Sequence, residues 1–254
     1  MIEEIEQQPA VLEKTFRKEI RAIEDFRRRI QKAEISLVVL VARGTSDNAA
    51  LFGRYLIEMV LGLPVSLAAP SVTTLYGTRP CWKNALVVGL SQSGESTDTN
   101  LILESAKEQG ALTIGITNEP ESSTARIVDE VFLVHAGRER SVAATKTYTG
   151  QMLMLYLLCY ALGARFDPRD LQKLPEITEQ TLRLKREVAE LSERYTNMSN
   201  AVVVGRGLNY ANAFEFSLKM METCYVVAER FSGADFYHGP IALIERGETG
   251  APKK

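Results

Sequence analysis

Two apolar runs in the first half of the chain each end in a short polar run, and a helical pattern follows each polar run. The apolar, polar and helical parts of the two units cover residues 37–42, 43–48 and 49–61, and residues 85–90, 91–96 and 97–109. Each unit predicts a buried parallel strand that enters a helix through a tight turn. The turn therefore lies at the carboxyl end of a strand and at the amino end of a helix.

The alternation of strand and helix patterns continues along the chain. Strands are predicted at 112–117 and 131–135, a short helix at 122–128 and a long apolar helix at 142–162. Apolar residues three and four positions apart predict an N-terminal amphipathic helix, and they are Leu12, Phe16, Ile20, Ile23, Phe26 and Ile30. This order predicts an α/β sandwich around a parallel sheet, with ligands beyond the carboxyl ends of the strands.

The opening pattern returns later in the chain. Residues 201–207 repeat the apolar run, small residue, Arg and Gly of residues 38–44, at an offset of 207 − 44 = 163 positions. The two prolines of residues 165–175 indicate a linker. A helix with one apolar stripe follows, made of Ile177, Leu184, Val188, Leu191 and Tyr195. The expected organisation is an N-terminal helical segment (1–34), a first domain (35–165), a linker and helix (166–198) and a partial second copy of the domain (199–254), in which a last helix starts at 239–244.

Charge and composition exclude several classes of protein. Thirty basic and thirty-two acidic residues leave a net charge of −2, and no basic stretch indicates a nucleic-acid partner. The first residues of the chain are acidic, unlike the basic start of a secretory signal peptide. The longest apolar stretch, 152–162, is too short to cross a membrane. Cys81, Cys159 and Cys224 lie far apart in sequence, as expected of reduced thiols. We therefore expect a cytoplasmic protein with no nucleic-acid or membrane partner.

The two polar turns have the composition of an anion site. Unpaired N–H groups and the helix dipole favour an anion at a helix amino end. Neutral side-chain donors add to them: Thr45, Ser46, Ser91, Gln92, Ser93 and Ser96. Neither turn has a lysine, so this is not a nucleotide-binding P-loop, and a phosphorylated metabolite is the expected ligand. The alternative is that these hydroxyls only cap helices.

A second constellation follows the repeated turn. Glu215, Lys219 and Glu222 are spaced i, i+4 and i+7, which places all three on one helix face. A solvated row of ion pairs is the alternative. His238 precedes Gly239 at a helix start and could equally be a packing residue. Lys146 lies near the start of its helix, where a cation is mildly unfavourable, so we expect it to have a local partner.

These motifs resemble the sugar isomerase (SIS) domain. The runs at 44–46, 91–96 and 142–146 carry the resemblance. The runs at 215–222 and 238–244 are similar to the isomerase half of glutamine–fructose-6-phosphate aminotransferases and to stand-alone relatives, including glucosamine-6-phosphate deaminases. The resemblance implies a flavodoxin-like, doubly wound three-layer sandwich, and a reaction that uses no metal and no organic cofactor.

The resemblance also implies a substrate and residue roles. The 6-phosphate of a hexose or amino-hexose 6-phosphate would lie on the turn at 91–96. The residues implied to bind the substrate are Gly44, Thr45, Ser46, Ser91, Gln92, Ser93, Ser96, Val142 and Ala143. Glu222 would move a proton between C1 and C2, and Lys219 would stabilise the developing charge. Glu215 would support the helix or the sugar hydroxyls, and His238 would open the sugar ring across a homodimer.

The implied reaction converts glucosamine 6-phosphate to fructose 6-phosphate. Two alternatives stay open, a non-catalytic phosphosugar sensor and an isomerase fragment of a glutamine–fructose-6-phosphate aminotransferase. The sequence stops within the second copy of the domain, and Lys253 and Lys254 do not match the family's C-terminal lysine motif. Impaired catalysis is therefore expected.

Overall fold

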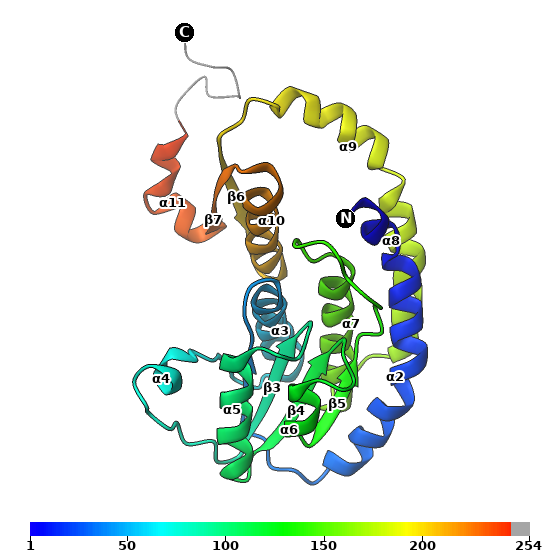
Figure 1. Cartoon of the computed structure of the whole chain (residues 1–254), viewed down its shortest axis with the longest axis vertical. Helices are drawn as coiled ribbons and strands as arrows, with labels where there is room; N and C mark the ends of the chain where they lie inside the picture. The colour runs from blue at the N-terminus through cyan, green and yellow to red at the C-terminus, as the bar shows by residue number, and fades with distance from the viewer. Residues whose placement is uncertain (245–254) are drawn as a thin grey trace. The chain divides into compact units, whose positions relative to one another are not determined.

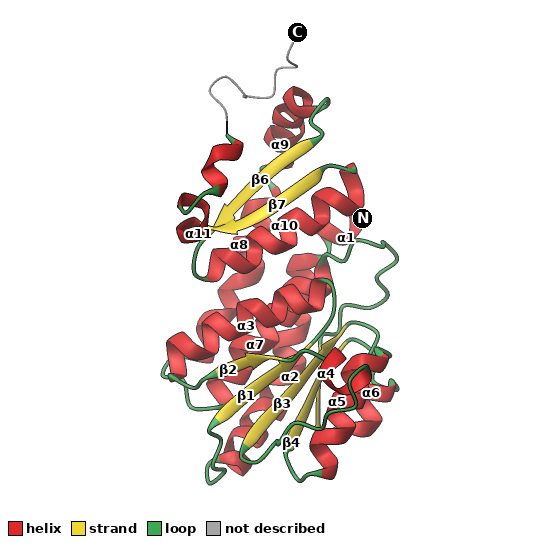
Figure 2. Cartoon of the chain, turned by 90° about the vertical axis from the view of Figure 1, so that its left-hand side faces the viewer, coloured by secondary structure: helices red, strands yellow, loops and turns green. Residues whose placement is uncertain are grey.

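The computed structural model describes residues 1–244, and the chain forms two compact units, of which the first is Met1–Glu176 (Figure 1). Lys253 and Lys254 lie outside the described residues. The first unit contains a five-stranded parallel sheet in the order β2-β1-β3-β4-β5 (Figure 2). Its strands are β1 (Leu37–Val41), β2 (Val65–Leu67), β3 (Ala85–Ser91), β4 (Leu112–Thr117) and β5 (Glu130–Leu133). This is the flavodoxin-like order, and the predicted doubly wound parallel sheet is confirmed.

Helices cover both faces of this sheet. On one face lie α3 (Thr45–Leu61) and α7 (Lys146–Ala161), and α2 (Gln8–Ile30) packs along α7 and the β5 edge. On the other face lie α5 (Thr97–Glu108) and α6 (Ser123–Ile127), with the short α4 (Ser71–Thr74) beside α5. The result is the predicted three-layer sandwich.

The apolar runs become strands because the sheet is covered on both faces. Val39, Val41 and Val87 pack with Ile102 and Leu103 of α5. Val38, Leu40 and Leu86, which alternate with them along β1 and β3, are also fully buried. A strand with two buried faces reads as a continuous apolar run rather than as an alternating one.

The N-terminal helix is amphipathic, as predicted. A short helix, α1 (Ile2–Glu6), precedes α2. Along α2, the side chains of Leu12, Phe16, Ile23 and Phe26 are buried. Phe26 meets Phe132 of β5 edge to face, with ring centroids 5.5 Å apart. The helix therefore closes the β5 edge of the first unit.

Several boundaries differ from the sequence prediction. Helix α3 begins at Thr45, four residues earlier than predicted, and α7 begins at Lys146, four residues later. The later start of α7 has a visible cause, since the Glu139 carboxylate accepts hydrogen bonds from the amides of Thr145 (2.7 Å) and Lys146 (3.0 Å). Strand β2 was not predicted, because three residues are too few to reveal a period.

The residues between 165 and 200 are more helical than predicted. The expected linker contains a 3₁₀ helix, η1 (Pro168–Lys173), and leads directly into α8 (Leu174–Leu182). The single predicted helix is divided into α8, α9 (Lys185–Ser192) and a 3₁₀ turn, η2 (Glu193–Tyr195). The break follows from the i→i−3 hydrogen bonds of the Arg183 and Leu184 amides, which interrupt the α-helical ladder. The apolar stripe predicted on this segment is exposed.

The second unit, from Ile177 onwards, contains a smaller parallel pair of strands. These are β6 (Asn200–Gly205) and β7 (Val227–Ser232), joined by α10 (Leu208–Cys224) and followed by α11 (Gly233–Tyr237) and the 3₁₀ helix η3 (Pro240–Leu243). Gly207 precedes α10 with φ 60° and ψ −134°, and Gly44 precedes α3 with φ 59° and ψ −133°. The match supports the proposal that the opening unit is repeated.

Two further features bear on the class of protein. No helix among residues 1–244 combines the length and apolar character that crossing a membrane requires. All three cysteines are unpaired, and burial raises the pKa of the Cys159 thiol to about 12. That thiol is therefore an inert packing residue.

Candidate functional site

The turn between β3 and α5 is organised by its own serines. The hydroxyl oxygens of Ser91 and Ser93 accept hydrogen bonds from the amides of Gly94 (3.0 Å) and Glu95 (3.3 Å). Ser96 caps α5 through its hydroxyl oxygen. The alternative that these hydroxyls cap helices is therefore correct for Ser96. A hydroxyl that accepts such a bond still has its own hydrogen to donate, so the same serines remain available to an anion.

Gly94 fixes the shape of this turn. Its φ of +66° is in the left-handed region, and a Cβ at this position would lie 2.2 Å from the Ser122 hydroxyl oxygen. Its carbonyl accepts hydrogen bonds of 2.9 Å from both the amide and the hydroxyl of Thr124. Only glycine fits here, and the close contact locks the turn against the start of α6.

Glu95 forms a second tie between the turn and α6. Its carboxylate accepts hydrogen bonds from the hydroxyl (2.6 Å) and the amide (2.9 Å) of Ser123. These bonds from Ser123 lower the pKa of the Glu95 carboxyl. The carboxylate thus serves the packing of the turn, while the serines on either side of it remain the candidate ligand donors.

The second polar turn lies at the carboxyl end of β1. Thr45 and Ser46 begin α3, and Gly44 precedes them. Ser46 is buried, and its hydroxyl oxygen accepts a hydrogen bond from Gln151 of α7 at 3.0 Å. The structure therefore gives Ser46 a packing role between two helices, in addition to the ligand role expected from the sequence.

Arg43 links the turn after β1 to the start of α5. The Arg43 guanidinium, directly after β1 and Ala42, pairs with Asp98 in the first turn of α5, with Nε 3.0 Å from the carboxylate. Burial raises the pKa of the Asp47 carboxyl, and the nearby charge of Arg43 opposes that rise. The edge of the site is therefore a mixed-charge surface, and a bound phosphate would depend on neutral donors.

Asn118 connects a third segment to the same edge of the sheet. It directly follows β4, and its amide donates to the Gln92 carbonyl at 3.1 Å. Its side chain accepts from the Ala136 amide (2.7 Å) and donates to the Gly137 carbonyl (2.8 Å). Sequence analysis missed this residue, although a polar side chain directly after an apolar strand was the available signal.

The segment from Ala136 leads to Val142 and Ala143, the remaining candidate sugar contacts. Val142 is 95% exposed and Ala143 is buried. The structure therefore brings the carboxyl ends of β1, β3 and β4 and the residue 136–145 segment to one edge of the sheet, where ligands bind in open α/β folds.

The second unit carries the predicted charged triplet. On α10, the Lys219 ammonium lies 3.2 Å from the Glu215 carboxylate and 2.7 Å from the Glu222 carboxylate. Glu215 is buried, and Glu222 is the most exposed of the three. A base and a cation in direct contact can move a proton and stabilise the resulting negative charge. The predicted grouping on one helix face is confirmed, while its chemical role stays a prediction.

His238 directly follows α11 and precedes Gly239, the N-cap of η3, so a helix does start after it as predicted, in the form of a 3₁₀ helix. Its amide donates to the Asp235 carbonyl at 3.0 Å, and η3 begins two residues later. The residue is exposed. The candidate residues thus form two groups, one in each compact unit.

A cavity of about 390 Å³ in the first unit lies elsewhere. Its lining includes Ile35, Leu63 and Gly163, which flank the amino ends of the strands or the end of α7. It lies toward the amino ends of the strands, whereas the polar turns lie at the carboxyl ends, and neither polar turn contributes to its lining.

Comparisons with known proteins agree with this architecture. The SIS domain model matches residues 33–161. Glutamine–fructose-6-phosphate aminotransferases from Aquifex aeolicus and Gloeobacter violaceus are 37% and 38% identical to the chain over 96% of its length. The chain spans only 41% and 42% of these two relatives.

Solved structures give the same result. The C-terminal domain of glucosamine–fructose-6-phosphate aminotransferase from Francisella tularensis matches with a TM-score of 0.80 at 29% identity, covering 96% of this chain and 72% of that one. A Silicibacter pomeroyi protein provisionally assigned as a phosphosugar isomerase matches with a TM-score of 0.88 at 31% identity, covering 95% and 73%. With its flavodoxin-like sheet and its polar turns at the strand ends, the chain belongs to the SIS domain family.

Proposed function

We propose that this protein binds a hexose 6-phosphate or amino-hexose 6-phosphate and converts glucosamine 6-phosphate to fructose 6-phosphate. The observation that carries the proposal is the turn at 91–96. Its serines are held at the amino end of α5, where backbone amides and the helix dipole favour an anion. Its left-handed Gly94 leaves no space for a side chain over the backbone.

The proposed reaction starts from the open-chain sugar. Glu222 removes the proton from C2 of glucosamine 6-phosphate and returns it to C1, while O1 gains a proton and the C2 amine loses one, which leaves a hydroxyl at C1 and an imine at C2. Water then adds to C2 and ammonia leaves, giving fructose 6-phosphate. Lys219 lies 2.7 Å from Glu222, close enough to stabilise the negative charge that develops during the proton transfer.

The other residues have supporting roles in this proposal. Glu215 holds Lys219 from the opposite side, at 3.2 Å. His238 exchanges the ring-oxygen proton during opening, because an imidazole can both donate and accept a proton. No metal ion or organic cofactor is required by these steps.

A non-catalytic phosphosugar-binding module is the second candidate. The phosphate-binding turn lies in the first compact unit, whereas Glu222 and Lys219 lie in the second. Binding could therefore persist without turnover. An isomerase part of a longer glutamine-dependent aminotransferase is a further alternative, since the chain matches about two fifths of such relatives.

Replacing Ser91 and Ser93 together with alanine tests the phosphate site. Each hydroxyl that bonds a charged group contributes about 1.5–3 kcal/mol, so we expect affinity for fructose 6-phosphate to fall by at least about 100-fold. Isothermal titration calorimetry measures the change. Ser36→Ala, an exposed serine before β1 at the other edge of the sheet, is the matched control. Equal affinities in wild type and the double variant would place the phosphate elsewhere.

Glu222→Gln tests the proton transfer. Loss of a positioned base lowers a rate by roughly 10²–10⁴-fold, so fructose 6-phosphate and ammonia release from glucosamine 6-phosphate should fall by that factor, with sugar-phosphate affinity retained. Glu229→Gln, which changes an exposed glutamate of β7, is the control. A Glu222→Gln variant as active as wild type would remove Glu222 from the mechanism. A wild type that binds but never turns over the sugar would favour the binding module.

We also propose that the protein is a homodimer whose partner contributes His238 to the neighbouring site. Exposed apolar side chains support self-association, among them Met59 (64% exposed) and Leu75 (72%). Light scattering at micromolar concentration should give twice the mass of one chain. A monomer throughout that range would contradict the shared site.

A further inference from the structure

The segment between β5 and α7 is held by polar contacts at both ends. At its start, the Asn118 side chain pairs with the Ala136 amide and the Gly137 carbonyl. At its end, the Glu139 carboxylate accepts from the amides of Thr145 and Lys146. The middle of the segment, residues 140–144, has neither of these anchors, so another element must fix it.

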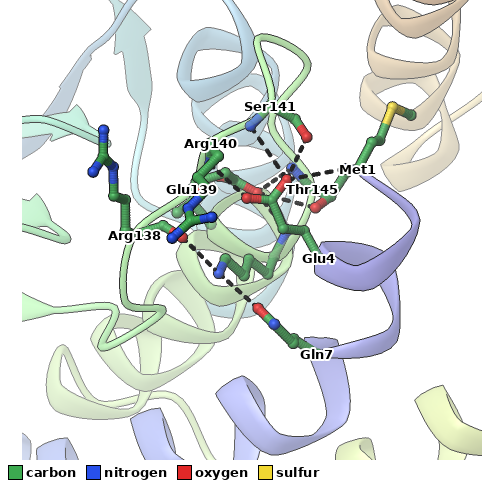
Figure 3. A network of polar contacts seen from close by, with 10 residues as sticks. Met1, Glu4, Gln7, Arg138, Glu139, Arg140, Ser141 and Thr145 are labelled. Carbon is green, nitrogen blue, oxygen red and sulfur yellow. Dashed lines mark hydrogen bonds and ion pairs between the residues drawn. The ribbon is translucent and has the colours of Figure 1, made fainter.

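That element is the short N-terminal helix α1. Figure 3 shows the Glu4 carboxylate directed at the backbone of the segment. It accepts hydrogen bonds from the Arg140 amide, from the Ser141 amide at 3.3 Å and from the Ser141 hydroxyl. The ammonium group of Met1 lies 3.4 Å from the same carboxylate. The hydroxyl of Ser141 and the amide of Arg140 lower the pKa of the Glu4 carboxyl to about 2.

The contact is specific rather than a surface ion pair. Glu4 is 6% exposed, and burying a carboxylate is costly unless hydrogen bonds replace its lost hydration. Here the replacement donors come from two consecutive residues of one loop, Arg140 and Ser141. A buried charge satisfied in this way holds the backbone of the loop in one conformation.

A second contact ties the same loop to the residue that joins α1 and α2. Lys146 is 3% exposed, and its ammonium donates to the Gln7 side chain (2.8 Å) and to the Arg138 carbonyl (2.9 Å). These are the local partners that the position of Lys146 led us to expect. The N-terminal segment therefore contacts the loop at residues 140–141 through Glu4, and contacts Lys146 at the start of α7 through Gln7.

The residue that follows Ser141 is exposed to solvent. Val142 is 95% exposed although it is apolar, and it lies directly beside two amides bonded to Glu4. An ordered loop that presents an apolar side chain avoids the entropic cost of ordering that loop when a ligand binds. Glu4 thus anchors the loop, and Val142 is the residue of the loop that is exposed to a ligand.

We propose that Glu4 is a positioning residue for sugar binding. Its carboxylate fixes residues 140–141 so that the exposed Val142 contacts the carbon skeleton of the phosphosugar, while the phosphate lies on the turn at 91–96. The inference rests on the proposed function, because it assigns the loop to the sugar part of the same ligand. Helix α1 is then part of the binding site.

Glu4→Gln tests this assignment with two probes, fructose 6-phosphate and inorganic phosphate. Weaker hydrogen bonds to the loop should lower the affinity for fructose 6-phosphate by roughly tenfold. The affinity for inorganic phosphate should stay within about twofold, because phosphate reaches only the serine turn. Amide hydrogen exchange at Arg140 and Ser141 should accelerate. Glu3→Gln, an exposed glutamate of the same helix, is the matched control and should change none of these quantities.

A loss of affinity for fructose 6-phosphate without a loss for inorganic phosphate distinguishes a positioning role from a general structural role. Equal losses for both probes, or no loss for either, would overturn the inference. If Glu4→Gln fails to fold, Ser141→Ala removes a single donor to Glu4 and should give the same split with a smaller loss. If the wild type binds fructose 6-phosphate no more tightly than inorganic phosphate, the proposed function is overturned instead. If amide hydrogen exchange at Arg140 and Ser141 is unchanged in Glu4→Gln, Glu4 does not anchor the loop.

Discussion

The candidate site depends on the absence of a side chain at Gly94. The left-handed backbone of this residue brings its Cα against Ser122. Its carbonyl accepts hydrogen bonds from both the amide and the hydroxyl of Thr124. The turn after β3 is therefore built against the connection after β4. Asn118 extends the same construction, because it binds the Gln92 carbonyl and the segment after β5. One chain of neutral hydrogen bonds thus runs across three strand ends, and it fixes the serine hydroxyls where an anion would lie.

The sequence was most informative where structure is determined locally. Buried strands such as β3 and β4 read directly as apolar runs, and β4 matches its predicted bounds of 112–117. The polar turns were found because parallel strands place their carboxyl ends at one edge. The spacing of Glu215, Lys219 and Glu222 likewise needed only helical geometry to predict their contact.

Residues that act across long separations were not predictable in this way. Glu4 binds Ser141, a partner 137 positions away, and nothing in its local sequence distinguishes it from Glu3. The start of α7 was placed too early because the Glu139 side chain, rather than the local pattern, determines where the helix begins. Ser46 has a partner on α7, Gln151, that periodicity cannot reveal. The sequence identified the edge of the sheet that would carry the site, but not the contacts that hold its loops.

The central claim concerns the location of the phosphate, and a crystal structure of the 254-residue chain with fructose 6-phosphate tests it most directly. The account predicts the phosphorus atom within the turn at 91–96, with the hydroxyls of Ser91 and Ser93 donating to phosphate oxygens and Val142 against the sugar carbons. A phosphate bound instead in the cavity beside Ile35, or at the repeated turn at Gly207, would contradict the account.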